Sequence, residues 1–181
     1  MKIKKIAAVC KARGKCYLYD YTDADGVVEQ WIGNGAAMYP VTGMPYLQLD
    51  NITTLFELTS KQADKLHMEK AEAPEIIDLR DAVVGEVMAQ KSELHISSGS
   101  VTILPVTANG NTRFLDESLI APVQARYDDI EYWLRRMPDG TPYYAVKEGL
   151  MLVGIVMPLH NMDAVAELLS DIGESYREDE L

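Results

Sequence analysis

The chain has few cysteines, no long apolar run and none of the common catalytic signatures among its 181 residues. Its longest apolar run, residues 150–159, contains Gly154 and Pro158. This run is far shorter than the roughly 20 apolar residues of a membrane-spanning helix, so it predicts a buried strand. The basic N-terminus has only a short apolar part, broken by lysines, and no cleavage-site pattern, which disfavours a signal peptide. We therefore expect a cytoplasmic protein that does not bind membranes.

Cysteine and histidine are too sparse to suggest a metal centre. The two cysteines, Cys10 and Cys16, lack both a secretory signal and a second pair, so free thiols are favoured over the alternative of a disulfide. A zinc site needs about four ligands at suitable spacing. The histidines are far from both cysteines in the chain: His67, His95 and His160. We expect no metal and no cofactor.

Motifs for catalysis are also missing. The chain contains no nucleophile elbow, phosphate loop, dinucleotide fingerprint or HExxH helix. His95 precedes several serines, but no orienting acid adjoins it in the sequence. The acidic loop at residues 20–29 fits a calcium loop poorly, because Tyr21 and Ile32 would occupy two carboxylate positions. We expect no enzyme, although a site assembled from distant residues stays open as an alternative.

Charge is abundant but unevenly distributed. Apolar residues make up 48% and charged residues 25% of the chain, which is typical of a globular protein. The net charge of −11 disfavours binding of nucleic acid by the whole surface. Residues 1–15 nevertheless carry only basic charges, and residues 163–181 are strongly acidic. This polarity permits a local anion-binding surface at the N-terminus.

The basic N-terminal segment predicts an amphipathic helix that stops at Gly14. Its apolar residues Ile3, Ile6, Ala7 and Cys10 follow helical spacing. With this stripe facing inward, the lysines face outward and can contact phosphates, whereas the alternative is a solvated helix face. The candidate nucleic-acid-binding residues are Lys4, Lys5, Lys11, Arg13 and Lys15.

Turn signals predict antiparallel hairpins around Asp25-Gly26 and Asn109-Gly110. Apolar spacing also predicts helices at residues 51–68, 75–89 and 128–136, and a last one from about residue 163. The polar segment 69–75 is the best candidate for a boundary. We expect two lobes, residues 1–72 and 73–172, each a helix with a β-meander, and an acidic tail, residues 173–181.

One pattern occurs three times, namely two apolar residues, a proline and another apolar residue. It contains Pro40, Pro105 and Pro158, to which we assign a structural role. A proline lacks the N–H needed by a strand ladder, so it belongs at a sheet edge, a bulge or a strand end. The recurrence predicts an α+β fold built from repeated helix and antiparallel β-meander units.

Aromatic residues alternate along the segment "YLYDY", residues 17–21, and Trp31 follows nearby. An aromatic ladder of this kind can stack on nucleic-acid bases. The neighbouring charges are acidic rather than basic, which favours packing in the core or in a protein interface.

Two resemblances add to these expectations. The stretch "KIKKIAAVCKARGKCYLYD", continuing to "QWIGNGAAMYPVTGMPYL", resembles small proteins encoded in phage and prophage gene clusters. The segment "LVGIVMPL", residues 152–159, resembles the closing strand of bacterial beta sliding clamps. This chain is shorter than a clamp, lacks a basic residue soon after "VMPL" and continues further.

These observations together favour a non-enzymatic, phage-derived accessory protein that acts through protein contacts as a homo-oligomer. The alternative is a DNA-associated factor that uses the basic N-terminal helix. For this alternative, the second resemblance implies a clamp-like fold.

Overall fold

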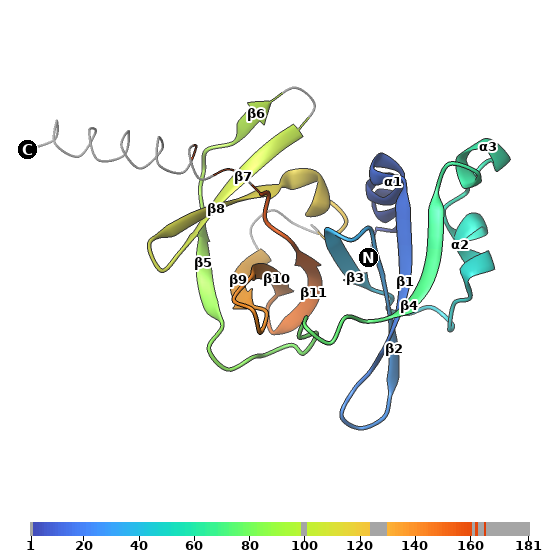
Figure 1. Cartoon of the computed structure of the whole chain (residues 1–181), viewed down its shortest axis with the longest axis horizontal. Helices are drawn as coiled ribbons and strands as arrows, with labels where there is room; N and C mark the ends of the chain where they lie inside the picture. Colours follow the sequence, from blue (N-terminus) through green and yellow to red (C-terminus); the bar gives the residue numbers. More distant parts are fainter. Residues whose placement is uncertain (1, 99–100, 124–129, 161, 163–164, 166–181) are drawn as a thin grey trace, which may run out of the picture.

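A large β-sheet dominates the molecule (Figure 1). The computed structural model describes residues 2–98, 101–123, 130–160, 162 and 165. The sheet has 11 strands in the order β4-β1-β2-β3-β11-β10-β9-β5-β7-β6, and β8 pairs with β7. The strands are β1 (Lys15–Thr22), β2 (Val28–Gly33), β3 (Ala37–Pro40), β4 (His67–Glu72), β5 (Val87–Lys91), β6 (Ile96–Ser98), β7 (Val101–Ala108), β8 (Asn111–Asp116), β9 (Ile130–Arg136), β10 (Pro142–Glu148) and β11 (Met151–Val156). The helices are α1 (Ile3–Arg13), α2 (Leu49–Leu55), α3 (Ser60–Ala63) and the 3-10 turn η1 (Glu117–Leu119).

The expected α+β fold of repeated helix and meander units is wrong, because the described residues form a sheet-dominated structure. Residues 128–136 were expected to be helical, but 130–136 form β9, with Tyr132 and Leu134 buried on one side. Residues 75–86 lack helix and precede β5. The helix expected at 51–68 is two short helices, and Glu57 between them has a φ of 50°. Most of the expected last helix lies outside the part of the chain that the structure describes, and so does the whole tail at residues 173–181.

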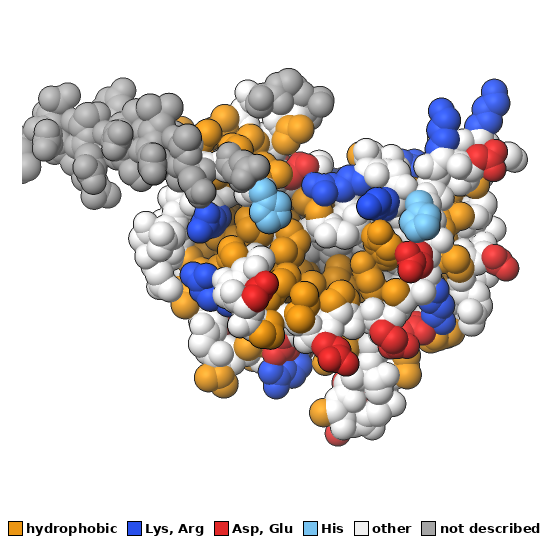
Figure 2. All heavy atoms as spheres, in the orientation of Figure 1, with side chains coloured by type: hydrophobic (Ala, Val, Ile, Leu, Met, Phe, Trp, Pro, Cys, Tyr) orange, Lys and Arg blue, Asp and Glu red, His pale blue; other side chains and the backbone are white. Residues whose placement is uncertain are grey.

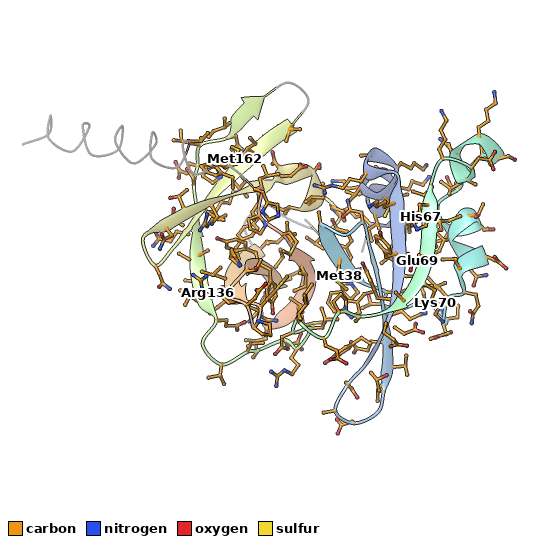
Figure 3. The ribbon with its side chains drawn as sticks, in the orientation of Figure 1. Met38, His67, Glu69, Lys70, Arg136 and Met162 are labelled. Atoms are coloured by element: carbon orange, nitrogen blue, oxygen red, sulfur yellow. The ribbon has the colours of Figure 1, made fainter. Side chains whose placement is uncertain are left out.

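Pairing between strands far apart in the sequence makes the sheet continuous. β3 pairs antiparallel with β11 through Met38 and Ile155, and Met38 lies near the middle of the molecule (Figure 3). β1 pairs with β2 antiparallel and with β4 in parallel. Strands from both sides of residue 72 therefore belong to one sheet, while the division into two lobes stays a prediction.

The sheet has two faces with separate cores. The first, which we call the packed face, lies against α1, α2 and η1 and against side chains of β7 and β8, the distant strands of the same sheet. Ile6, Ile52 and Leu104 are among its buried residues. The second, the strap face, buries Trp31 and Leu79 in a smaller cluster. Only the strap face carries the groove described below.

The predicted N-terminal helix is confirmed as α1. Its buried residues are Ile6, Ala7, Val9 and Cys10, and Gly14 ends it with a φ of 65°. A left-handed residue at this position suits glycine, which has no Cβ to clash. The prediction of free thiols is also confirmed, since Cys10 and Cys16 are both buried and unlinked.

Both predicted hairpins are confirmed. β1 and β2 enclose a loop in which Asp23 Oδ1 accepts hydrogen bonds from the backbone N–H groups of Asp25 and Val27. β7 and β8 are joined by Asn109 and Gly110, whose φ angles of 51° and 73° are the positive pair of a type I′ turn.

The three prolines do not share one position. Pro40 ends β3, as predicted, but β3 lies inside the sheet between β2 and β11 rather than at an edge. Pro105 lies within β7, between the residues that pair with β6 and those that pair with β5. The missing N–H is tolerated there because Pro105 lies in the gap between the end of β5 and the start of β6, where neither strand pairs with it. Pro158 follows the end of β11.

Within the described residues, none of the helices has both the length and the apolar character needed to cross a bilayer.

Candidate functional site

Residues 73–86, which we call the strap, cross the strap face between β4 and β5 (Figure 1). The buried guanidinium of Arg135 on β9 holds this segment. It donates hydrogen bonds to the carbonyl oxygens of Asp78 (2.9 Å), Arg80 (2.9 Å) and Asp81 (3.1 Å). These carbonyls would otherwise serve a helical ladder, which explains why apolar spacing did not produce a helix here.

A buried carboxylate balances the charge of Arg135. Glu86 Oε2 accepts from Arg135 Nε at 2.8 Å, and Glu86 Oε1 pairs with the ammonium of Lys147. Lys147 also lies 4.5 Å above the ring of Trp133. Burial alone raises the pKa of Glu86, but hydrogen bonds from Lys147 and Arg135 outweigh it and hold this pKa below its ordinary value. This network fixes the C-terminal end of the strap.

Further bonds fix the middle of the strap. The N–H of Asp78 donates to the hydroxyl of Tyr143 at 3.0 Å, and the N–H of Leu152 donates to Asp81 Oδ1 at 2.7 Å. Leu79 is buried against the strap face. The strap thereby forms one wall of an adjoining groove.

This groove, which we call the hairpin groove, has a volume of about 500 Å³ and lies beside the turn end of the β1–β2 hairpin. Its walls come from that hairpin, the loop after β3, the strap and the start of β11. The lining residues are Tyr21, Asp23, Val28, Glu29, Gln30, Trp31, Pro40, Val41, Thr42, Met44, Pro45, Tyr46, Leu79, Arg80, Asp81, Met151 and Leu152.

Gln30 on β2 positions the loop after β3. Its buried amide oxygen accepts from the N–H of Leu47 at 2.6 Å, and its Nε2 donates to the carbonyl of Leu47 at 3.1 Å. The same Nε2 donates to Asp20 Oδ1 at 2.9 Å. One side chain therefore pairs both backbone groups of Leu47 and sets the position of this wall.

Tyr46 in the same loop joins a second polar cluster. Its hydroxyl donates to Asp20 and accepts from Lys70 Nζ at 2.8 Å. Lys70 Nζ lies 2.9 Å from Asp20 Oδ2 and 4.6 Å from the centre of the Tyr46 ring. Burial raises the pKa of Asp20, but hydrogen bonds from Tyr46, Gln30 and Lys70 leave it below its ordinary value. Figure 3 shows Lys70 on β4 beside His67 and Glu69.

The groove has excess negative charge. Asp23, Glu29 and Asp81 line it, and Arg80 is the one basic residue among its lining side chains. Arg80 Nε lies 2.9 Å from Asp78 Oδ1, so an outside carboxylate already offsets its charge. In Figure 2, hydrophobic side chains cover the middle of the molecule's visible face, and acidic side chains lie along its lower border.

Trp31 contributes an unusual donor to this groove. Its side chain is only 2% exposed, and its Nε1 has no hydrogen-bond acceptor among the described residues. The hydroxyl of Tyr144 is also without a partner there, but it lies in the core of the packed face. Buried polar groups are normally paired, so the unpaired N–H of Trp31 is an exception among the described residues.

The candidate nucleic-acid-binding residues lie elsewhere. Lys4, Lys5, Lys11 and Arg13 are exposed on α1, and Lys15 is exposed at the start of β1. Lys4 Nζ is 3.4 Å from Glu57 Oε2 in an exposed ion pair. Since α1 packs on the packed face, these residues and the hairpin groove belong to different faces of the sheet.

Other candidates have structural roles. Tyr19 and Trp31 are buried in the core, which is one of the two kinds of packing predicted for this aromatic segment. Tyr17 is half-buried, and its ring stacks on that of Tyr19 at 5.7 Å. His95 Nδ1 lies 3.5 Å from Glu117 Oε2, an acid that the sequence did not place near it.

In the described part of the chain, no three metal-ligating side chains are grouped to hold an ion.

No family model, curated protein or solved structure matches this chain. The hairpin groove must therefore be interpreted from its own chemistry. The sequence draws attention to Trp31, Pro40 and Tyr21 for other reasons. No local signal indicates that they share one groove with Leu79 and Met151.

Proposed function

We propose that this chain is a non-enzymatic, phage-derived accessory protein that acts through protein contacts at the hairpin groove. The observation that supports it is an open groove with apolar walls and an exposed apolar rim. The phage-derived part rests on the sequence resemblance alone. Self-association as a homo-oligomer is one form that these contacts can take.

The rim residues carry this proposal. Val28, Tyr46 and Met151 line the groove, yet 48%, 51% and 63% of their surfaces are exposed. Exposed apolar residues that cluster around a depression mark interaction sites, whereas scattered ones need no explanation. Aromatic residues and methionine are also enriched in protein interfaces. The polar groups beside this rim hold the loop and the hairpin in place, which favours binding over catalysis.

Site-specific photo-crosslinking tests this proposal. A benzoylphenylalanine at Met151 should form protein adducts in the cells that express the chain, and the rim variant Val28→Ser, at an exposed residue, should reduce them. Leu94 is the matched control, because its exposure of 64% nearly equals the 63% of Met151 and it lies outside the groove. An adduct of twice the chain mass would identify self-association. Equal adduct yields at both positions, or none at Met151, would refute the proposal.

A DNA-associated role is the second candidate, and the exposed basic residues on α1 favour it. Lys5, Lys11 and Arg13 all face solvent, and α1 contains no acidic residue. Such a surface can contact phosphates while the remaining acidic surface is repelled by them.

Duplex DNA binding at several salt concentrations tests this second role. The affinity should fall steeply with salt, and the triple variant Lys4→Glu, Lys5→Glu, Lys11→Glu should lose it. The matched control replaces the exposed Lys61 and Lys65 near α3 with glutamate. Equal loss in both variants, or no binding by the unmodified chain at low salt, excludes a specific role for α1.

A further inference from the structure

We infer that the hairpin groove binds an extended partner segment in which apolar residues are flanked by lysine or arginine. This inference rests on the proposed function and adds the chemical class of the partner. It draws on the apolar lining of the groove, its charge and the unpaired N–H of Trp31.

The lining of the groove suits an extended segment. A short extended segment can place alternate side chains against the apolar wall formed by Leu79, Val41 and Met44.

The charge of the groove requires a basic partner. Glu29 is exposed on the rim, and Asp81 adds a second carboxylate from the strap wall. Arg80, their basic neighbour, is already paired with Asp78. Complementary charge favours lysine or arginine at the ends of the bound segment. It also disfavours the chain's own residues 163–181 as the occupant, because they are strongly acidic.

The indole of Trp31 supplies the polar contact that an extended backbone can satisfy. Its N–H lacks an acceptor among the described residues, although the side chain is 2% exposed and lines the groove. A peptide carbonyl is a strong acceptor present in every residue of a partner segment. This contact fixes the depth of the segment and does not depend on the segment's charge.

Three fluorescein-labelled hexapeptides with capped ends provide the test. They share the apolar centre Leu-Leu-Val-Leu, and their two end residues are Lys and Arg, Gln and Gln, or Glu and Glu. Binding to the full chain is measured by fluorescence polarisation at 50 and 500 mM salt. We expect the basic peptide to bind at least tenfold more tightly than the neutral one and the acidic peptide to bind weakest. The preference should shrink at high salt, since exposed charges are screened.

Two variants measure separately how the charge of Glu29 and the indole of Trp31 contribute to peptide binding. Glu29→Gln should reduce the preference for the basic over the neutral peptide at least threefold, whereas Glu93→Gln, an exposed control outside the groove, should not. Trp31→Phe should weaken the basic and neutral peptides by the same factor. Its urea midpoint should be recorded with the affinity, so that loss of binding is not confused with unfolding.

The outcomes distinguish this inference from the proposed function. If the neutral peptide binds as tightly as the basic one, the partner class is wrong and a protein-binding groove remains. If none of the peptides binds to a folded chain, the extended basic segment is excluded. The proposed function then depends on the adducts formed at Met151, which require no assumption about the sequence of the partner.

Discussion

At the residue scale, Gln30 shows how a single side chain defines the wall of the hairpin groove. Its amide pairs both backbone groups of Leu47 and one oxygen of Asp20. A loop held in this way is preorganised, so that a ligand does not have to order it on binding. The shape of the groove therefore depends on β2 as much as on the loop after β3.

Replacing Gln30 should destabilise the fold through lost hydrogen bonds. We expect Gln30→Ala to reduce the free energy of unfolding by about 1–3 kcal/mol, because Leu47 would keep two buried groups without partners. Urea denaturation measures this change. Gln90 on β5 is exposed and is the matched control, with an expected change within about 0.5 kcal/mol. Equal effects of the two substitutions would contradict a structural role for the Gln30 amide.

The two thiols give a chemical prediction at the same scale. A hydrogen bond with Cys16, together with burial, raises the pKa of Cys10 well above its ordinary value. The thiolate is the reactive form, so the folded protein should resist iodoacetamide at pH 8. Intact mass should show no adduct in buffer and two adducts in guanidinium. Rapid alkylation of the folded chain would show that the α1–β1 corner opens readily.

At the scale of elements, the strap is a segment held by side chains rather than by a backbone ladder. Glu86, Arg135 and Lys147 form a buried ionic network at its end, and Arg135 reaches back to three strap carbonyls. Breaking a buried pair leaves uncompensated charge, which is strongly destabilising.

Glu86→Gln should therefore reduce the free energy of unfolding by about 3–5 kcal/mol. Glu93→Gln, on the exposed surface, should change it by less than about 0.5 kcal/mol. Denaturation by urea compares the two variants. If Glu86→Gln lowers the free energy of unfolding only slightly, the hydrogen bonds from Arg135 to the strap carbonyls hold the strap without the carboxylate of Glu86.

The same carboxylate predicts a dependence on pH. The pKa of Glu86 is lower in the folded chain than its ordinary value of 4.5, so the folded state binds this proton less readily than the unfolded state. Its contribution to stability is complete above pH 4.5 and is lost as the pH falls through the folded pKa. The slope of stability against pH below 4.5 should be shallower in Glu86→Gln than in the unmodified chain. Identical slopes would place the acid sensitivity at other carboxylates, such as Asp20 and Asp78, whose pKa values are also lowered.

The elements that the sequence predicts well are those whose causes are local. Gly14 and Asn109-Gly110 need positive φ angles, which their residue types readily adopt, so the end of α1 and the β7–β8 turn follow from a few neighbouring residues. Helical spacing in the strap and in β9 was misleading. The strap carbonyls bond to Arg135, and β9 pairs with β5 and β10, both of which are contacts between distant residues.

The candidate site was harder to predict for the same reason. Trp31 and Tyr21 stood out as aromatics, but their common groove exists only after the strap and the start of β11 have joined the hairpin. The orphan N–H of Trp31 depends on the packing around the indole, which no residue spacing encodes.

At the scale of the whole molecule, the two ends of the main sheet path should differ in local stability from its centre. Among the described residues, β4 forms ladder bonds with β1 alone, whereas β3 is paired on both sides, with β2 and β11. Amides in the centre of a sheet open only with larger parts of the structure.

Hydrogen exchange measured by mass spectrometry tests this difference. Peptides that cover β4 should exchange faster than peptides that cover β3 and β11. The charged residues of β4 should keep this exposed strand from pairing with other chains. Equal protection of β4 and β3 would indicate that β4 has a further partner in solution.

The pairing of Met38 with Ile155 also has a consequence for synthesis. A ribosome makes the N-terminal hairpin long before it makes β11, so β3 must emerge with one edge unmatched. Until β11 has also left the exit tunnel, the nascent protein carries an open apolar strand that can join a neighbouring nascent chain. Translation rate and chaperone access between residues 40 and 156, rather than final stability, should therefore limit the yield of folded protein.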